Sequence, residues 1–177
     1  ERLNAVVHLK REDLLPSFSF KLRGAYNLLS QLPRDFDEVI TFSVGSQGHS
    51  VAEAARALGL PATVVMPHRT PLMRQTAIER AGAKVVVAGT TLAEAEAEAV
   101  RLAEANPRCQ LLQPHDHPLV IAGQATAGLE VIKQVGSAME AFGDGEGQLD
   151  AIFVVAGGSS LLAGVAAIMK SVMPRTK

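Results

Sequence analysis

Apolar residues along the chain follow two alternating patterns, one typical of buried strands and the other of amphipathic helices. Short runs of Val, Ile and Ala predict strands, and the segments that follow them have apolar residues three or four positions apart, which predicts helices. Glycine or proline closes several of the helical segments. The predicted strands are residues 6–9, 39–42, 62–66, 84–88, 110–112 and 151–155, and the predicted helices are residues 22–32, 51–58, 71–81, 91–105, 118–135 and 161–172.

This alternation predicts an α/β fold in which helices flank parallel sheets. In such sheets ligands bind at the carboxyl ends of the strands, where loops lead into helices. The polar, glycine-rich residues 136–148 are expected to form an exposed connection. Residues 151–169 carry no charge and are long enough to span a membrane, but the small residues from Gly157 to Ser160 predict a strand, a loop and a helix instead.

Composition narrows the classes of function. The chain has 177 residues, of which 47% are hydrophobic and 20% charged, as is ordinary for a soluble globular protein. A net charge of -1 and an aromatic content of 4% give no basis for binding nucleic acid or an anionic membrane surface. Cys109 is the single cysteine, which excludes an internal disulfide and fits a reducing compartment, either the cytoplasm or an organellar matrix. Because the chain begins with Glu1 and shows no secretory leader, it is expected to be a fragment or a processed product.

The candidate for covalent chemistry is Lys21, which lies between apolar neighbours at the predicted start of a helix. A lysine held near apolar surface loses part of its preference for the charged form and can act as a nucleophilic amine. A Schiff base with an aldehyde cofactor requires such an amine. The position alone is weak evidence, because most lysines on helices are solvated.

Two loops rich in serine and glycine, residues 43–50 and 157–161, follow predicted strands and precede predicted helices. Backbone N–H groups at the start of a helix form an anion site, and small side chains let the anion come close. The same residues also suit a helix cap or a tight turn that binds nothing. The run His115-Asp116-His117 is interpreted as a surface turn rather than a metal site, because three consecutive residues do not readily ligate one ion.

Two segments around Lys21 carry a resemblance to a known family. Lys10-Arg11-Glu12-Asp13-Leu14 and Ser19-Phe20-Lys21-Leu22-Arg23-Gly24-Ala25 resemble the signature of the serine/threonine dehydratases, which are pyridoxal-phosphate enzymes of fold type II. The resemblance covers nearly the whole chain and implies two Rossmann-like α/β subdomains, the second incomplete here. Residues 1–37 and 118–177 are then expected to belong to the larger, cofactor-binding subdomain, and residues 38–117 to form the smaller one.

The resemblance also implies the roles of individual residues. Lys21 is expected to hold pyridoxal 5'-phosphate as a Schiff base and, once freed, to take the α-proton of the substrate. The substrate carboxylate is expected at Ser43, Gly45, Ser46 and Gln47. The implied cofactor-binding residues are Phe20, Lys21, Ser46, Gly157, Gly158, Ser159, Ser160 and Leu161.

The implied activity is the deamination of L-threonine or L-serine to 2-oxobutanoate or pyruvate and ammonia, as in isoleucine biosynthesis, by a homo-oligomer (a dimer or tetramer). A small amino acid is the expected substrate, with no nucleic-acid or membrane partner and no metal. Val44 disfavours racemisation, because the similar serine racemases have a proton-transferring serine there. The motif after Lys21 is also less like that of β-replacing enzymes such as cysteine synthases.

Departures from the family pattern keep a second hypothesis open. Ser46 stands where the family has Asn, Gln47 where it has His, and Ser159 and Ser160 where it has Gly. A Cβ atom is costly wherever the backbone needs a positive φ. The alternative is therefore a non-catalytic or altered homologue that binds pyridoxal phosphate or acts only as a partner subunit.

Overall fold

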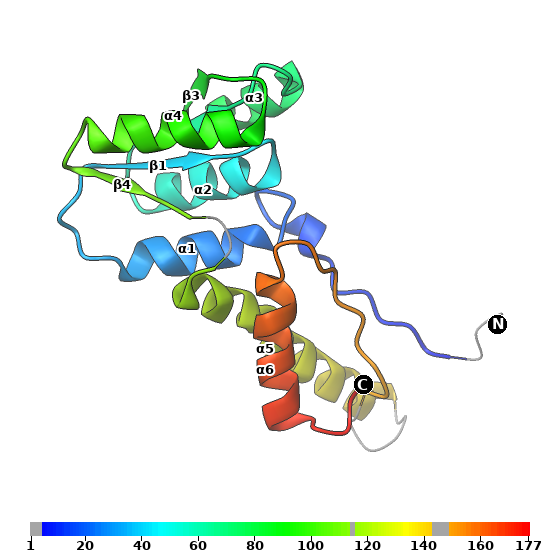
Figure 1. Cartoon of the computed structure of the whole chain (residues 1–177). Coiled ribbons are helices and arrows are strands. Elements are labelled where there is room, and N and C mark those ends of the chain that lie inside the picture. The colour runs from blue at the N-terminus through cyan, green and yellow to red at the C-terminus, as the bar shows by residue number, and fades with distance from the viewer. Residues whose placement is uncertain (1–4, 114–115, 143–148) are drawn as a thin grey trace.

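Four parallel strands form one sheet at the centre of the first part of the chain (Figure 1). The structure, a computed structural model, describes residues 5–113, 116–142 and 149–177. The strand order is β3-β2-β1-β4, and Ile40 lies opposite both Thr63 and Leu111. The strands are β1 (Glu38–Phe42), β2 (Ala62–Met66), β3 (Lys84–Val87) and β4 (Cys109–Leu111).

Helices cover both faces of this sheet, and two further helices pack beyond it. In Figure 1, α4 lies on one face of the sheet and α2 on the other. Helix α1 lies between α2 and the pair α5 and α6. The helices are the 3-10 turn η1 (Glu12–Leu14), α1 (Lys21–Gln31), α2 (Ser46–Ala57), α3 (Leu72–Arg80), α4 (Leu92–Glu104), α5 (Pro118–Phe142) and α6 (Ser160–Val172).

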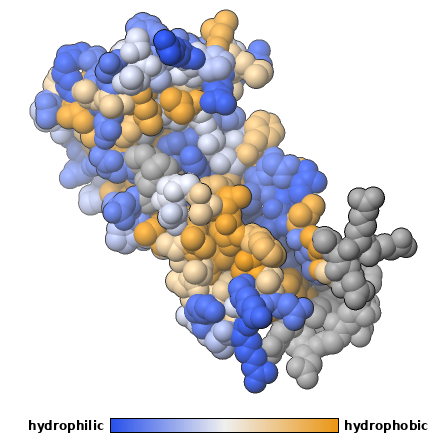
Figure 2. Space-filling model, turned by 45° about the vertical axis from the view of Figure 1, so that its right-hand side comes forward, coloured by the Kyte–Doolittle hydropathy of each residue, from blue (hydrophilic) through white to orange (hydrophobic). Residues whose placement is uncertain are grey.

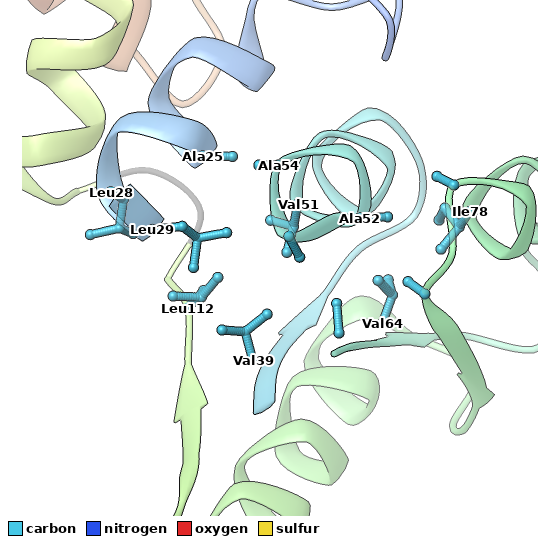
Figure 3. Packing of buried hydrophobic residues seen from close by; sticks show 14 of the residues in the cluster. Ala25, Leu28, Leu29, Val39, Val51, Ala52, Ala54, Val64, Ile78 and Leu112 are labelled. Atoms are coloured by element: carbon cyan, nitrogen blue, oxygen red, sulfur yellow. The ribbon is translucent and has the colours of Figure 1, made fainter. Parts of the chain in front are cut away.

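The core follows from the alternation of side chains along each strand. On β1, Ile40 and Phe42 belong to a buried cluster with Ala95 and Ala99 of α4. Val39, the residue before Ile40, faces the other way, into the larger cluster that includes residues of α1 and α2 (Figure 3). Alanine on the buried faces of α2 and α4 lets these helices lie close to the strands.

A second packing unit is formed by α1, α5 and α6. Helix α5 contacts both of the others, and glycines allow the backbones to touch. A Cβ atom on Gly123 of α5 would lie 2.5 Å from the carbonyl oxygen of Arg23 on α1. One on Gly164 of α6 would lie 2.6 Å from the carbonyl oxygen of Ile121 on α5. Helix α5 therefore fixes the position of α1 relative to α6.

The predicted α/β architecture is confirmed, and the strands at 39–42, 62–66, 84–88 and 110–112 are found within one residue of their predicted ends. The strand predicted at residues 6–9 is wrong, because this segment is exposed and pairs with no described strand. The strand predicted at 151–155 is also wrong. Its side chains alternate between partly buried and exposed, but its backbone bonds to the chain end instead, with Ile152 N–H donating to the Lys177 oxygen at 2.9 Å.

Helix α5 is longer than predicted. It was expected to end at residue 135, with an exposed connection over 136–148, but it continues through Gly136 to Phe142. One glycine inside a helix costs only about 1 kcal/mol, which the good helix formers after it can offset. The rest of the predicted connection, residues 143–148, lies outside the described residues.

The uncharged stretch 151–169 is broken as predicted, with extended chain up to Ala156 and helix only from Ser160. Within the described residues, no helix has the length and apolarity needed to cross a membrane. Apolar side chains nevertheless gather on the part of the surface that contains α5 and α6 (Figure 2). Phe153 and Val155, which are 98% and 69% exposed, belong to the unpaired segment beside these helices.

Candidate functional site

The first residues of three helices meet at one pocket. Lys21 begins α1, Ser46 begins α2 and Ser160 begins α6, and all three line a cavity of about 390 Å³. This volume lies in the range of small-molecule sites, roughly 300–1,000 Å³. The complete lining is Ser19, Phe20, Lys21, Ser46, Val155, Ala156, Gly157, Gly158, Ser159, Ser160 and Leu161.

The starts of α2 and α6 at this pocket have no side-chain caps, whereas the start of α4 is fully capped. Thr91 accepts a hydrogen bond from the Glu94 N–H at 3.2 Å, and the Glu94 carboxylate accepts from the Thr91 N–H at 3.3 Å. Within the described residues, no side chain caps α2 or α6 in this way, while at the start of α1 the Ser19 hydroxyl accepts a hydrogen bond from the Lys21 N–H at 3.3 Å. Uncapped N–H groups and the helix dipole together favour a bound anion. The pocket is therefore suited to anionic groups.

Lys21 supplies the pocket's amine. Its side chain is half-buried, and burial lowers the pKa of Lys21 because the charged form loses hydration. Within the described residues, its ammonium group makes no hydrogen bond or ion pair. The lowered pKa increases the fraction of neutral, nucleophilic amine near neutral pH.

The turn before Lys21 is anchored on α2. The hydroxyl groups of Ser17 and Ser50 lie 3.0 Å apart, and the ring centroids of Phe18 and His49 lie 6.2 Å apart. Phe18 has a φ of 54°, a left-handed conformation that costs a non-glycine residue about 1–3 kcal/mol. The backbone bends there to bring Phe20 and Lys21 to the pocket.

The first loop, residues 43–47, contributes only one of its residues to the pocket lining. Ser46 lines the pocket, whereas Ser43, Gly45 and Gln47 do not. The buried Ser43 hydroxyl accepts a hydrogen bond from the Gly45 N–H at 3.0 Å, which shapes the loop. Arg74 donates to the Val44 carbonyl at 2.7 Å and would lie 3.1 Å from a Cβ atom on Gly45.

The second loop carries two serines in different conformations. Ser159 has a φ of 61°, in the region that favours glycine, whereas Ser160 is buried in the first helical position of α6. The expected cost of a Cβ atom in this loop therefore applies to Ser159 and not to Ser160.

This difference predicts opposite effects of two neighbouring substitutions. Ser159→Gly should stabilise the fold by about 0.5–1 kcal/mol, because a left-handed backbone strains serine but not glycine. Ser160→Gly, the matched control, should destabilise it by about 0.5 kcal/mol, because glycine adds backbone entropy to a helical position. Urea denaturation midpoints measure both changes, and a shift of the same sign in both variants would contradict the prediction.

A cluster of ion pairs lies behind the turn that carries Lys21. Arg23 binds Glu12 at 2.6 Å and Glu130 at 2.7 Å, and Lys10 binds Glu130 at 2.5 Å. A mixed-charge run such as residues 10–13 has two interpretations, a solvated strand end or a segment that holds the following loop. The contacts of Lys10 and Glu12 support the second, whereas Arg11 and Asp13 pair with each other at the surface.

The ion cluster predicts a specific sensitivity to acid. Hydrogen bonds from Arg23 and Lys10 lower the pKa of Glu130 from 4.5 to about 2. A carboxyl group with a lowered pKa in the folded state stabilises the fold fully above its unfolded pKa, and this contribution is lost as the pH falls toward the folded value. Glu130 is 42% exposed, so its contribution is roughly 1–2 kcal/mol.

We therefore expect Glu130→Gln to be less stable than the wild type at neutral pH, and the difference to shrink as the pH falls from about 5 to about 2. Urea midpoints of both proteins at several pH values measure this. A stability difference that stays constant with pH would show that the negative charge of Glu130 does not stabilise the fold.

The structure brings together some of the sequence-predicted site residues and not others. Every residue predicted to bind the cofactor lines the pocket, while three of those predicted for the substrate carboxylate lie outside its lining. Ser19 and Ala156, each next to a predicted residue, were missed, as was Val155, which lies two residues before Gly157. Of the predicted surface turn, His115 lies outside the described residues, and His117 accepts the Leu119 N–H at 3.1 Å near the start of α5. Within the described ranges, no group of three acidic, histidine or cysteine residues is placed to hold a metal ion.

Comparison with known proteins defines the class to which this fold and pocket belong. The sequence matches the family described as pyridoxal-phosphate dependent enzymes over residues 1–177. The chain therefore belongs to this family, and the suspected relationship is confirmed.

The relatives narrow the class further. The chain is 44% identical over 99% of its length to the mitochondrial threonine dehydratase of Saccharomyces cerevisiae and covers 29% of that protein. It is 40% identical over its whole length to the biosynthetic L-threonine dehydratase of Haemophilus influenzae and covers 33% of it. The chain thus spans about a third or less of these relatives.

Solved structures agree with this relationship. The processed form of threonine deaminase isoform 2 from Solanum lycopersicum matches 99% of this chain and 46% of its own, with a TM-score of 0.88 and 39% identity. Serine racemase from Dictyostelium discoideum matches 94% of this chain and 51% of its own, with a TM-score of 0.80 and 34% identity. The fold is that of fold type II pyridoxal-phosphate enzymes, as the resemblance implied.

Proposed function

We propose that this chain carries the pyridoxal-phosphate site of a threonine dehydratase, an enzyme that deaminates L-threonine, and more slowly L-serine, to a 2-oxo acid and ammonia. The observation that carries the proposal is the juxtaposition in one pocket of Lys21, whose pKa is lowered, with two uncapped helix starts. Such a pocket offers one amine and two separate sites for anions. The similarity to threonine dehydratases supports this choice of substrate.

The residues fit the cofactor. Its aldehyde group matches the amine of Lys21, and its phosphate matches the hydroxyls of Ser159 and Ser160 and the N–H groups of Ser159 and Leu161, where α6 begins. The Ser160 N–H donates to the Gly158 carbonyl at 2.9 Å instead. Gly157 and Gly158 line the same end of the pocket and leave the backbone accessible. Phe20 provides apolar surface beside Lys21.

The substrate carboxylate fits the start of α2. Ser46 faces the pocket there, and the first-turn N–H groups of α2 have no side-chain cap. Ser43 and Gly45 shape the loop through their hydrogen bond, and the buried Gln47 lies in the first turn of α2. Their part in carboxylate binding is therefore to form the loop and its N–H groups rather than to line the cavity.

When bound, pyridoxal phosphate supplies an electron sink for the negative charge that develops at the substrate α-carbon. The Lys21 amine takes the α-proton, which requires its neutral form, and burial favours that form. The N–H groups at Ser46 hold the carboxylate and so orient the α-carbon toward Lys21. Val44 has no transferable proton, so the chain offers no second acid-base group at that position, and we propose elimination rather than racemisation.

We also infer how the chain is organised in the parent protein. Residues 38–117 contain the whole four-stranded sheet and would form the smaller subdomain. Residues 1–37 and 118–177 contain the stack of α1, α5 and α6 and would contribute to the larger one. By analogy with relatives named as mitochondrial and chloroplastic, we propose that the protein works in an organellar matrix or in the cytoplasm. The homo-oligomer implied by the family resemblance stays a prediction.

The test is an assay of the purified full-length protein with pyridoxal phosphate and L-threonine. We expect 2-oxobutanoate and ammonia in equal amounts, a lower rate with L-serine, and no conversion of L-serine to D-serine. Cofactor binding without any 2-oxo acid would overturn the proposal. It would favour the non-catalytic homologue suggested by Ser46, Gln47 and the left-handed Ser159.

A further inference from the structure

The guanidinium group of Arg23 has no N–H left for a ligand. Its Nε donates to Glu12 at 2.6 Å, and its Nη2 donates to Glu12 and to Glu130, both at 2.8 Å. Its Nη1 donates to Glu130 at 2.7 Å and to the Thr126 hydroxyl at 3.1 Å. A guanidinium has five N–H donors, and these contacts occupy all of them.

The cluster around Arg23 is also electrically balanced. Two cations, Lys10 and Arg23, face two carboxylates, Glu12 and Glu130. The side chain of Arg23 is 12% exposed and that of Glu12 is 17% exposed. A neutral cluster whose guanidinium group is buried and fully bonded is not an anion site, so its role must be to hold parts of the chain together.

The parts that it joins are the ones that determine where Lys21 lies. Glu12 belongs to η1, which precedes the pocket residues Ser19–Lys21 in the sequence. Arg23 belongs to the first turn of α1, and Glu130 to α5. Lys21 precedes Arg23 by two residues in the same turn, where the Ser19 hydroxyl accepts a hydrogen bond from the Lys21 N–H at 3.3 Å. Because the Lys21 ammonium makes no bond within the described residues, its position depends on the backbone of this turn.

We propose that Arg23 is a positioning residue, which fixes the first turn of α1 against η1 and α5 and thereby places the Lys21 amine in the pocket. The proposal rests on the proposed function only in taking this amine as the group that holds the cofactor and accepts the α-proton. The planar guanidinium binds two carboxylates on different edges at once. Lysine keeps the charge but has a single donor atom, so Arg23→Lys should not restore the arrangement.

The test compares Arg23→Lys with Arg101→Lys in the full-length protein. Arg101 forms an ion pair of 2.7 Å with Glu98 on α4 and is 65% exposed, so the same chemical change is made at a surface pair away from the pocket. The first readout needs no cofactor: the rate at which an acylating reagent modifies Lys21, measured by mass spectrometry across a range of pH. The second is the affinity for pyridoxal phosphate.

In Arg23→Lys we expect the pH profile of Lys21 modification to move upward, toward that of a solvated lysine, while the far-ultraviolet circular dichroism stays that of the folded protein. We expect cofactor affinity to fall by about tenfold or more, since misplacing a reacting group by about 1 Å can cost about 10²-fold. Arg101→Lys should change neither quantity.

A folded Arg23→Lys protein with the wild-type Lys21 profile and cofactor affinity would overturn the proposal. If Arg23→Lys does not fold, Glu130→Gln provides the same comparison, because it removes one of the two carboxylates while leaving Arg23 bound to Glu12. Failure of the wild type to deaminate threonine would instead count against the proposed function, since the profile of Lys21 is measured without cofactor or substrate.

Discussion

Lys21→Ala is expected to lower the rate of threonine deamination by about 10²–10⁴-fold or more, because the variant loses both the nucleophile that holds the cofactor and the base that takes the α-proton. It should also lack the visible absorbance that arises when a lysine amine holds pyridoxal phosphate. Lys21→Arg should fail in the same way, since a guanidinium stays charged at any relevant pH and neither attacks an aldehyde nor accepts the proton.

The matched control for this prediction is Lys84→Ala. Lys84 begins β3, is exposed, and does not line the pocket. Its removal should leave both turnover and absorbance unchanged, within the small effects that are usual for surface substitutions. Turnover and absorbance that survive in Lys21→Ala would show that another amine holds the cofactor.

Gly164→Ala is expected to cost about 2–3 kcal/mol of stability, the upper range for overpacking a close contact. The added methyl group would lie 2.6 Å from the Ile121 oxygen and 2.7 Å from the Ala125 nitrogen. Both are backbone atoms of α5, so no side chain can rotate away and the two helices must separate. The first turn of α6, with Ser160, would then shift and weaken the binding of the cofactor phosphate.

Gly136→Ala provides the matched control because it makes the same change on α5. A Cβ atom at Gly136 meets nothing within 4 Å. Alanine should therefore stabilise the helix there by about 0.5–1 kcal/mol. Urea midpoints measure both variants, and Gly164→Ala at wild-type stability would show that α5 and α6 can separate without cost.

The sheet was predictable because its signals are local. Residues 62–66 are apolar except for the β-branched Thr63, with Pro61 before them and Pro67 after them, and all five residues of β2 are buried. The start of α4 was equally clear, since Thr91 precedes the helix and Glu94 follows at the spacing of a capping box.

Two of the errors in the predicted secondary structure have different causes. Residues 151–155 have the composition of a buried strand, but a strand also requires a neighbouring strand to pair with, and no local pattern shows whether one is present. Residues 136–142 are helical although they were predicted to be an exposed connection. Glycine at the start of this segment was interpreted as a helix end, although one glycine only weakens a helix.

The candidate site was predictable only in part. The resemblance to a family pointed to the residues that line the pocket, because its motifs are short and contiguous. The contact between Arg23 and Glu130 joins residues 107 positions apart. An ion pair of this kind leaves no periodic signal in a sequence, so the cluster that holds the turn of Lys21 became visible only in the structure.

The bridging position of α5 has a consequence for folding. Lys21 and Ser160 stand near opposite ends of the chain, and their helices meet the pocket only when α5 has packed against both. Bringing together residues so far apart in the sequence costs conformational entropy, and no favourable contact energy offsets this cost until the helices have packed. The pocket is therefore expected to be among the last features to form, and capture of its anionic ligand would mark the completion of folding.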